Sequence, residues 1–362
     1  AGKITKFVLD VYVYVNLICG LIVKYNNNKT FDVALELANF FNRKPIIVEY
    51  DEYSFDNFPN KLSAIEITEP YFSQLEVYKA QNKRGFKISI DGHGADECLG
   101  GYNKDIENFG MHFQNSLSDL YRAIINLKGA EHLKKTIKRL NLIPNLHGFD
   151  IDIKRFVKIK EYRNEYVNSE KIDLINPFLE EDITELINYD FPHQILYLNS
   201  TYGHMQWLLN KWDKASMASS VEIRSPFLDW RFFQYALALP AELKTKNGQN
   251  KSILRDTFGK MLPKSVMEKK FKQGLPIVDF RKDKIALNLI KEAINQDDFK
   301  TSNIWNSQKI IADFNNINIR SKKINKILNL IRTYLMNKGF EKRKEKIINT
   351  YKKCEESFNK LN

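Results

Sequence analysis

The sequence predicts an α/β fold with a parallel sheet and a helical C-terminal part. Short runs of β-branched and aromatic residues alternate with segments whose apolar residues recur at helical spacing. Such alternation is typical of parallel sheets whose strands are joined by helices. The chain has 362 residues, 43% of them hydrophobic, which is enough for one large domain or two ordinary ones.

Composition and charge favour a cytoplasmic protein that binds neither membrane nor nucleic acid. No apolar run reaches the roughly 18 residues of a membrane helix, and the run 7–23 is interrupted by Asp10 and Asn16. The three cysteines have no metal-ligand spacing and cannot form a disulfide framework, which fits a reducing compartment. The net charge of +12 comes from scattered lysines, so we interpret it as a compositional bias rather than a nucleic-acid site.

In chain order, the first segments predict alternating strands and helices. The expected strands are 7–9, 11–15, 45–48 and 86–90, and the expected helices are 31–41 and 72–82. Thr30 is a plausible N-cap for the first of these helices. The order strand, helix, strand, helix, strand predicts a parallel sheet with right-handed crossovers.

Helical spacing dominates after residue 102. The expected helices are 117–127, 131–142, 154–168, 182–189, 193–210, 232–239, 251–261, 304–314 and 324–335. The helices between 117 and 168 carry no chemical motif, and we interpret them as a helical scaffold in preference to a lid over the site. We expect one domain over 1–340, followed by a basic helix or frayed tail over 341–362.

The most informative stretch is the loop that follows the strand 86–90. It has glycines at 92, 94, 100 and 101, and acids at 91, 96 and 97. Glycine lets backbone N–H groups approach a phosphate closely, and carboxylates can hold Mg²⁺ that bridges to phosphate oxygens. The pattern favours a nucleotide or metal site over the plain alternative, an acidic turn between a strand and a helix.

Three blocks carry a resemblance to a known family. Residues 91–102 read DGHGADECLGGY, which resembles the DGxGADExxGGY motif of the asparagine synthetase family's synthetase domain. Residues 213–229 read DKASMASSVEIRSPFLD, similar to D(R/K)xSMAxSxExRxPFLD. The stretch from Lys251 to Pro276 resembles KxxLR…LP…KxGFxxP. The three motifs stand in the family's order, which makes the resemblance specific.

The resemblance implies a three-layer parallel sheet of the adenine nucleotide α-hydrolase (PP-loop ATPase) type. It also implies an ATP- and Mg²⁺-dependent ligase: the side-chain carboxylate of aspartate is activated as an acyl-adenylate, and ammonia converts it to asparagine. Related enzymes that form β-lactams or cyclise peptides share these motifs and stay open as alternatives. Positioning and charge stabilisation carry such chemistry.

The resemblance also assigns roles to individual residues. Asp91 and Gly92 match positions that touch the nucleotide, and Asp96 matches a carboxylate that binds pyrophosphate or Mg²⁺. Lys272 matches a lysine that contacts the phosphates and neutralises charge on the leaving pyrophosphate. Glu97 is expected to lie behind the loop, without contacting the ligand, and to hold the loop in its conformation.

His93 departs from the family pattern, which often has an acid or glutamine at this position near the amine step. A histidine there can act as a general base near neutral pH or can hydrogen-bond within the loop, and both readings stay open. In the second block, two readings stay open for Glu222, Arg224 and Asp229: a buried ion-pair lattice that orders the loop, or direct contact with the substrate.

The family's ATP loop, SGGxDS, does not occur in this sequence. We expect either a chain that begins after that loop, a diverged loop, or a non-catalytic homologue. Full synthetases also carry an N-terminal glutaminase with a first-residue cysteine, whereas this sequence begins at Ala1. The resemblance therefore implies free ammonia, or ammonia from a glutaminase domain or subunit, as nitrogen source. The sequence does not give the oligomeric state, and a homodimer is one candidate assembly.

Overall fold

The computed structural model describes the larger part of the chain. The described residues are 21–24, 29–49, 57–67, 72–102, 166, 185, 189, 191–246, 249–267, 284–316 and 322–359. Helices make up most of these ranges, and none of the described helices combines the length and the apolar character needed to cross a bilayer.

Two pairs of parallel strands form the described sheet structure. β1 (Leu21–Lys24) pairs with β2 (Ile46–Glu49), and α2 (Lys29–Phe40) connects them. β3 (Ile88–Ile90) pairs with β4 (Glu222–Arg224), which lies far along the chain. A parallel strand–helix–strand unit therefore surrounds the helix expected over 31–41, but its first strand is β1 rather than the expected strands 7–9 or 11–15, which lie outside the described residues. Within the described residues the two pairs are separate two-stranded sheets, so the three-layer sheet stays a prediction.

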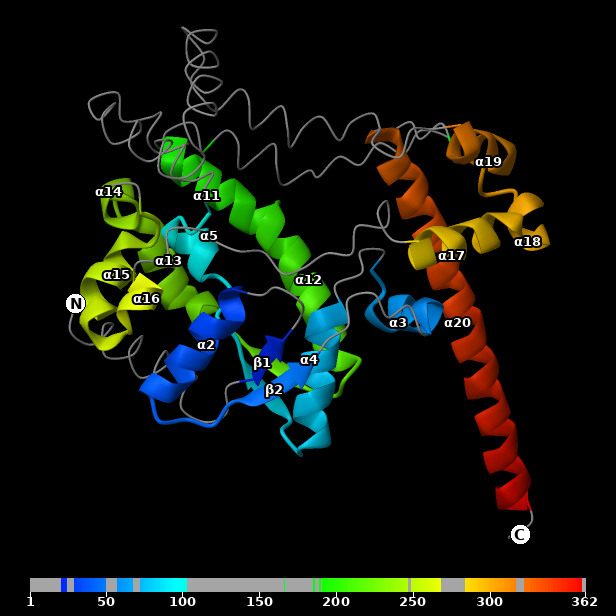
Figure 1. Ribbon diagram of the computed structural model, residues 1–362, viewed down its shortest axis with the longest axis horizontal. Coiled ribbons are helices and arrows are strands. Elements are labelled where there is room, and N and C mark those ends of the chain that lie inside the picture. Colours follow the sequence, from blue (N-terminus) through cyan, green and yellow to red (C-terminus); the bar gives the residue numbers. More distant parts are fainter. Residues whose placement is uncertain are drawn as a thin grey trace, which may run out of the picture.

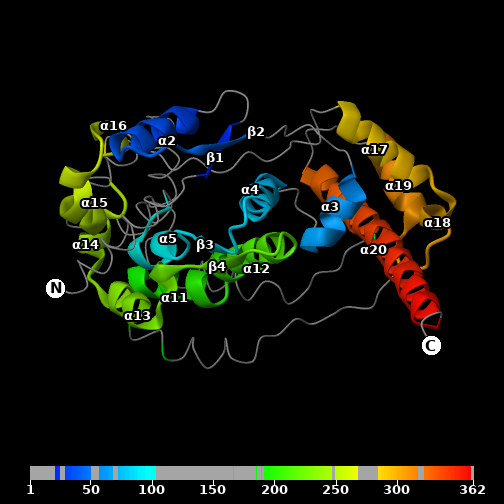
Figure 2. The ribbon, with the colours of Figure 1, turned by 90° about the horizontal axis from the view of Figure 1, so that it is seen from below.

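The other helices follow in chain order. They are α3 (Phe58–Ile65), α4 (Phe72–Lys83), α5 (Ala95–Leu99), α11 (Phe191–Thr201), α12 (His204–Met217), α13 (Trp230–Ala238), α14 (Ala241–Lys244), α15 (Ser252–Phe258), α16 (Lys264–Met267), α17 (Lys284–Asn295), α18 (Asp297–Lys300), α19 (Ser307–Asn316) and α20 (Lys322–Asn359), with 3₁₀ turns at Pro226–Leu228 and Gly259–Met261. Figures 1 and 2 show α20 beside α3 and α17–α19 at one end of the molecule, α13–α16 at the other, and α4 and α12 between them.

Several helix boundaries differ from the expected ones. The helix expected over 193–210 is two helices, because the chain leaves the helical region at Gly203 (φ −116°, ψ −130°). The helix expected over 324–335 extends through Asn359, so the boundary expected at residue 340 lies inside one continuous helix. α3 was not predicted, because Pro59 and its polar neighbours interrupt the apolar spacing.

Some expected elements lie outside the described residues. These are the strands 7–9 and 11–15, the helices 117–127 and 131–142, and all but a few residues of the helices 154–168 and 182–189.

The largest hydrophobic core lies between α3, α4, α12 and the C-terminal helices α17–α20. Its most buried members include Leu62, Leu75, Ala215, Ile290 and Ile331, each at most 1% exposed. Because α4 leads into β3 and α12 leads into β4, this core also holds the two strands from which the candidate site extends.

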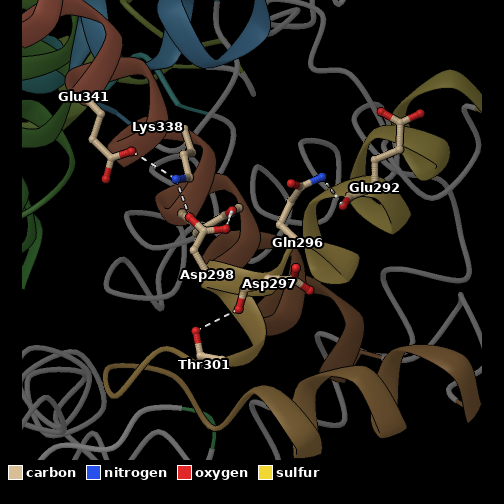
Figure 3. A network of polar contacts seen from close by, with 8 residues as sticks. Glu292, Gln296, Asp297, Asp298, Thr301, Lys338 and Glu341 are labelled. Atoms are coloured by element: carbon tan, nitrogen blue, oxygen red, sulfur yellow. Dashed lines mark hydrogen bonds and ion pairs between the residues drawn. The ribbon is translucent and has the colours of Figure 1, made fainter.

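A polar network joins α18 to α20 at the edge of this core (Figure 3). The Lys338 ammonium contacts the Asp298 carboxylate and lies 3.0 Å from Glu341 Oε2. The Tyr334 hydroxyl donates to Asp298 Oδ1 at 2.7 Å. The hydrogen bond from Lys338 holds the pKa of Asp298 below its usual value, and the same contact raises the pKa of Lys338.

We expect Lys338→Met to lower the free energy of unfolding at neutral pH by about 1 kcal/mol or less, since both partners are partly exposed. The stabilisation from Asp298 is present above the usual pKa of a carboxyl and is lost as pH falls through its lowered pKa. Urea unfolding of both proteins should therefore converge at acidic pH. Lys352→Met, at an exposed lysine of the same helix, is the matched control, and an equal loss in both variants would contradict the assignment.

Candidate active site

The candidate site extends from the carboxyl end of β3. Strand register pairs Ile88 with Glu222 and Ile90 with Arg224. The Asp91 N–H donates to the Arg224 carbonyl at 2.9 Å, so the pairing continues into the first residue of the loop. The loop therefore leaves the end of a parallel strand, where ligands bind in open α/β sheets.

Two glycines are required by the close packing of this loop. Gly94 has φ +95°, and a Cβ there would lie 2.3 Å from the Leu228 side chain of the second sequence block. A Cβ on Gly101 would lie 1.8 Å from Asp96 Oδ1. Side chains at either position would force the loop apart, so glycine lets the first two motifs pack together and lets the chain turn back over Asp96.

Asp91 is enclosed by hydrogen-bond donors. Its Oδ2 accepts from the Tyr78 hydroxyl at 2.6 Å, and its Oδ1 accepts from the Ser89 hydroxyl at 2.5 Å. Gln81 Nε2 in turn donates to Ser89 Oγ at 3.2 Å. His93 Nδ1 lies 3.6 Å from Asp91 Oδ2. Burial, followed by the charge of Asp91, raises the pKa of Tyr78 far above its usual value, so this phenol stays protonated and remains a donor. The adjoining Gly92 is exposed.

The structure brings a lysine of the third block to the loop. Lys251 Nζ lies 2.8 Å from Asp96 Oδ1, and the two side chains are 30% and 22% exposed. Lys251 also has a positive φ of 50°, which is uncommon for a side chain of this size and often marks a functional site. The lysine that opens the KxxLR block was the sequence signal for this residue, and the residue-by-residue assignment above missed it.

A hydrogen-bonded clamp holds the third block against the glycine turn. Asn250 Nδ2 donates to the Gly101 carbonyl at 2.6 Å. Arg255 Nε donates to the Asn250 carbonyl at 2.9 Å, and its Nη1 donates to the Met267 carbonyl at 3.0 Å. Met267 is the last described residue before the segment with Lys272, which itself lies outside the described residues.

Glu97 lies behind the loop, 4% exposed, and its Oε1 accepts from the Tyr102 hydroxyl at 2.5 Å. The adjacent Cys98 is fully buried, and burial raises the pKa of its thiol to about 12. A thiol with so high a pKa stays protonated at neutral pH and is a poor nucleophile. These neighbours thus contribute packing on the inner side of the loop.

The expected buried lattice of Glu222, Arg224 and Asp229 is wrong. Glu222 Oε1 lies 3.0 Å from Arg224 Nε, but their side chains are 58% and 61% exposed. Asp229 instead accepts from the backbone and guanidinium of Arg231, which lowers its pKa to about 2, and it caps α13. The lattice fails because the side chains of residues 222 and 224 lie on one face of β4, and that face is open to solvent.

One face of α12 lies along the loop and is aromatic. The Trp212 ring is 6.0 Å from the His93 ring, centroid to centroid, at 34° between planes. Lys211 Nζ lies 3.9 Å from the Trp207 ring centroid and 4.7 Å from that of Trp212. Trp212 therefore forms an aromatic side wall beside His93.

The described residues contain no cluster of three or more His, Cys, Asp or Glu side chains that could enclose a metal ion. Mg²⁺ commonly binds proteins through one or two carboxylates and shares the remaining positions with water and substrate phosphates. Asp96 supplies one such carboxylate at the open end of the strand pair. The donor set therefore fits an Mg²⁺ ion that arrives with phosphates, and does not fit a closed structural site.

Comparison with known proteins agrees with this geometry. The model of the Asparagine synthase family matches residues 27–326. Asparagine synthetase [glutamine-hydrolyzing] 1 of Bacillus subtilis is 28% identical over 230 residues, covering 58% of this chain and 34% of that protein. Asparagine synthetase [glutamine-hydrolyzing] 3 of the same organism is 26% identical over 202 residues, covering 55% and 28%.

Identity is higher over a shorter segment in a further relative. The glutamine-hydrolyzing asparagine synthetase of Gallus gallus is 47% identical over 58 residues, covering 15% of this chain and 10% of that protein. The matched region spans about a third of the length of the first Bacillus subtilis relative. Because the family model extends over most of the sequence and the site loop lies within it, this chain belongs to the asparagine synthase family.

Proposed function

We propose that this chain is the synthetase part of an ATP-dependent ligase that converts aspartate to asparagine. One observation carries the proposal: a glycine- and acid-rich loop leaves the end of a parallel strand, and Lys251 of a separate motif pairs with its Asp96. A lysine beside a carboxylate at this place suits a ligand that combines phosphate groups with a divalent cation.

The proposed reaction has two steps. An aspartate side-chain oxygen attacks the α-phosphorus of ATP, and the bond to the pyrophosphate oxygen breaks with its electron pair leaving on pyrophosphate. Ammonia then attacks the acyl carbon, loses a proton, and displaces AMP. Both steps need reactants held in line and developing charge stabilised, rather than a covalent intermediate on the protein.

Four residues have proposed roles at the phosphates. Lys251 and Lys272 neutralise charge on the leaving pyrophosphate, and Asp96 orients the Mg²⁺ that accompanies it. When bound, Mg²⁺ would act as a Lewis acid and spread the negative charge of the phosphates. Gly92, which is exposed and has no side chain, lets the nucleotide approach the backbone of the loop.

His93 is the proposed base of the amine step. Its ring is half-buried beside Trp212, and an imidazole is effective as a general base near neutral pH. The nitrogen donor is proposed to be ammonia released by a glutaminase domain or subunit, since the named relatives are glutamine-hydrolysing enzymes. A homodimer, a domain over 1–340 and a three-layer sheet remain parts of this proposal.

Measuring ATP–pyrophosphate exchange on the purified chain, with Mg²⁺ and aspartate, tests the activity. We expect aspartate-dependent exchange in the wild type and a loss of about 10²- to 10³-fold in Lys272→Ala. The exposed Lys352→Ala is the control for the loss of a positive charge. Exchange supported by another carboxylic acid would point to a β-lactam-forming or peptide-cyclising relative.

The missing SGGxDS motif specifically favours one other candidate, a non-catalytic member of the family. Calorimetry separates it from the ligase. No exchange together with no heat of ATP binding would contradict activity of this chain, and would be the result expected of a non-catalytic protein or of a chain that begins after the ATP loop.

A further inference from the structure

We propose that Asp91 is a positioning residue for His93, which fixes the imidazole so that Nε2 faces the reacting amine, rather than a direct ligand of the nucleotide. This inference rests on the proposed function and deepens it. The resemblance implies that Asp91 contacts the nucleotide, and the inference assigns this residue a different role. The observed contacts of the Asp91 carboxylate support the new role.

Both carboxylate oxygens of Asp91 already face protein groups. Oδ1 accepts from Ser89, and Oδ2 accepts from Tyr78 while lying 3.6 Å from His93 Nδ1. A carboxylate has about four lone-pair sites, and the hydrogen bonds from Tyr78 and Ser89 use half of them. The side chain is only 16% exposed, and this leaves little of it accessible to a ribose or an adenine.

The groups that hold Asp91 are themselves held by rigid elements. Tyr78 projects from α4 and is 1% exposed within the main hydrophobic core. Ser89 lies on β3, is 6% exposed, and accepts a hydrogen bond from Gln81. A carboxylate supported from a helix and a strand is fixed more precisely than one on a loop alone, which is what a positioning residue requires.

Asp91 Oδ2 lies 3.6 Å from His93 Nδ1, which is ion-pair distance and longer than a hydrogen bond, and its negative charge favours a proton on that nitrogen. When Nδ1–H points to a carboxylate, Nε2 carries the lone pair and can accept a proton. As the amine nitrogen forms its bond to the acyl carbon, an N–H proton passes to Nε2 and the N–H bonding pair stays on nitrogen. The C–O bond to AMP then breaks, with its electron pair leaving on the phosphate. The Asp91 charge stabilises the imidazolium that results.

Nitrogen-15 NMR of the histidine-labelled chain tests the orientation without requiring activity. His93→Gln identifies the His93 signals among the six histidines. We expect the neutral ring to carry its proton on Nδ1 in the wild type. In Asp91→Asn the amide can donate to Nδ1, so we expect the proton to move to Nε2. Glu76→Gln, on α4 but in an exposed pair with Lys79, should leave the tautomer unchanged.

Kinetics test the role in the reaction. We expect Asp91→Asn to lower the rate of amide formation by about 10- to 100-fold. General-base catalysis typically raises a rate by on the order of 10²- to 10⁴-fold, and Asp91 supports the base. ATP–pyrophosphate exchange should stay within about threefold of the wild type, since the carboxylate is not expected to touch the nucleotide. Tyr78→Phe, which keeps the ring, should reproduce the same split more weakly. Tyr334→Phe, which removes a hydroxyl from the remote Asp298, should not.

Two results would overturn the inference: an unchanged His93 tautomer in Asp91→Asn, or exchange that falls as far as amide formation. If Asp91→Asn does not fold, Tyr78→Phe decides by the same two measurements. A wild type without exchange would refute the proposed activity, whereas the NMR measurement would still decide whether Asp91 orients His93.

Discussion

Lys251→Met is expected to lower ATP–pyrophosphate exchange by about 10²- to 10³-fold, the effect of removing one preorganised charge from a site of charge development. Lys251 Nζ lies 2.8 Å from Oδ1 of Asp96, the carboxylate that would hold Mg²⁺. Methionine has a similar length without the charge. The variant also leaves the partly buried Asp96 carboxylate without the positive charge of Lys251. This unpaired negative charge adds to the loss of phosphate affinity. Initial rates of exchange at varied ATP and Mg²⁺ measure the effect.

Lys246→Met is the matched control for Lys251→Met. Lys246 is 62% exposed, and its ammonium lies 3.9 Å from the equally exposed Asp256, so we expect exchange within about twofold of the wild type. Asp96→Asn combined with Lys251→Met should cost less than the sum of the single changes, because the two residues act as a unit. Additive losses, or full exchange in Lys251→Met, would show that the pair does not act at the phosphates.

Gly339→Ala is expected to lower the free energy of unfolding by about 1 to 3 kcal/mol, the usual cost of overpacking a core. Gly339 lies on α20 where that helix meets α3, and a Cβ would be 2.1 Å from the Pro59 carbonyl oxygen and 2.7 Å from Ser63 Oγ. Backbone atoms cannot rotate away, so α20 must move. Helix propensity alone would favour alanine by about 1 kcal/mol, which makes the sign of the change informative. Chemical denaturation measures it.

Asn349→Ala provides the comparison for this substitution. Asn349 is exposed on the same helix, so alanine should be neutral or slightly stabilising there. Arg343 Nη1 donates to the Ser63 carbonyl at 2.6 Å, and the same contact region should therefore lose stability in Arg343→Met as well. A Gly339→Ala protein at least as stable as the wild type would mean that α20 and α3 do not approach so closely.

Local patterns in the sequence determined much of the fold and the identity of the site. The glycines and acids between residues 91 and 102 identified the loop, and helical spacing located α2 and α4 close to their observed bounds. These features depend on neighbours within a few residues, so they can be read from the chain itself. The three motifs in order likewise indicated the family that the comparison found.

Only the tertiary structure decided which side chains meet. β3 pairs with β4, Lys251 reaches Asp96, and Tyr78 binds Asp91, although no local periodicity connects these partners. The predicted ion-pair lattice failed for the same reason. Charge alone does not say whether a strand face is covered, and this is set by the packing of distant segments.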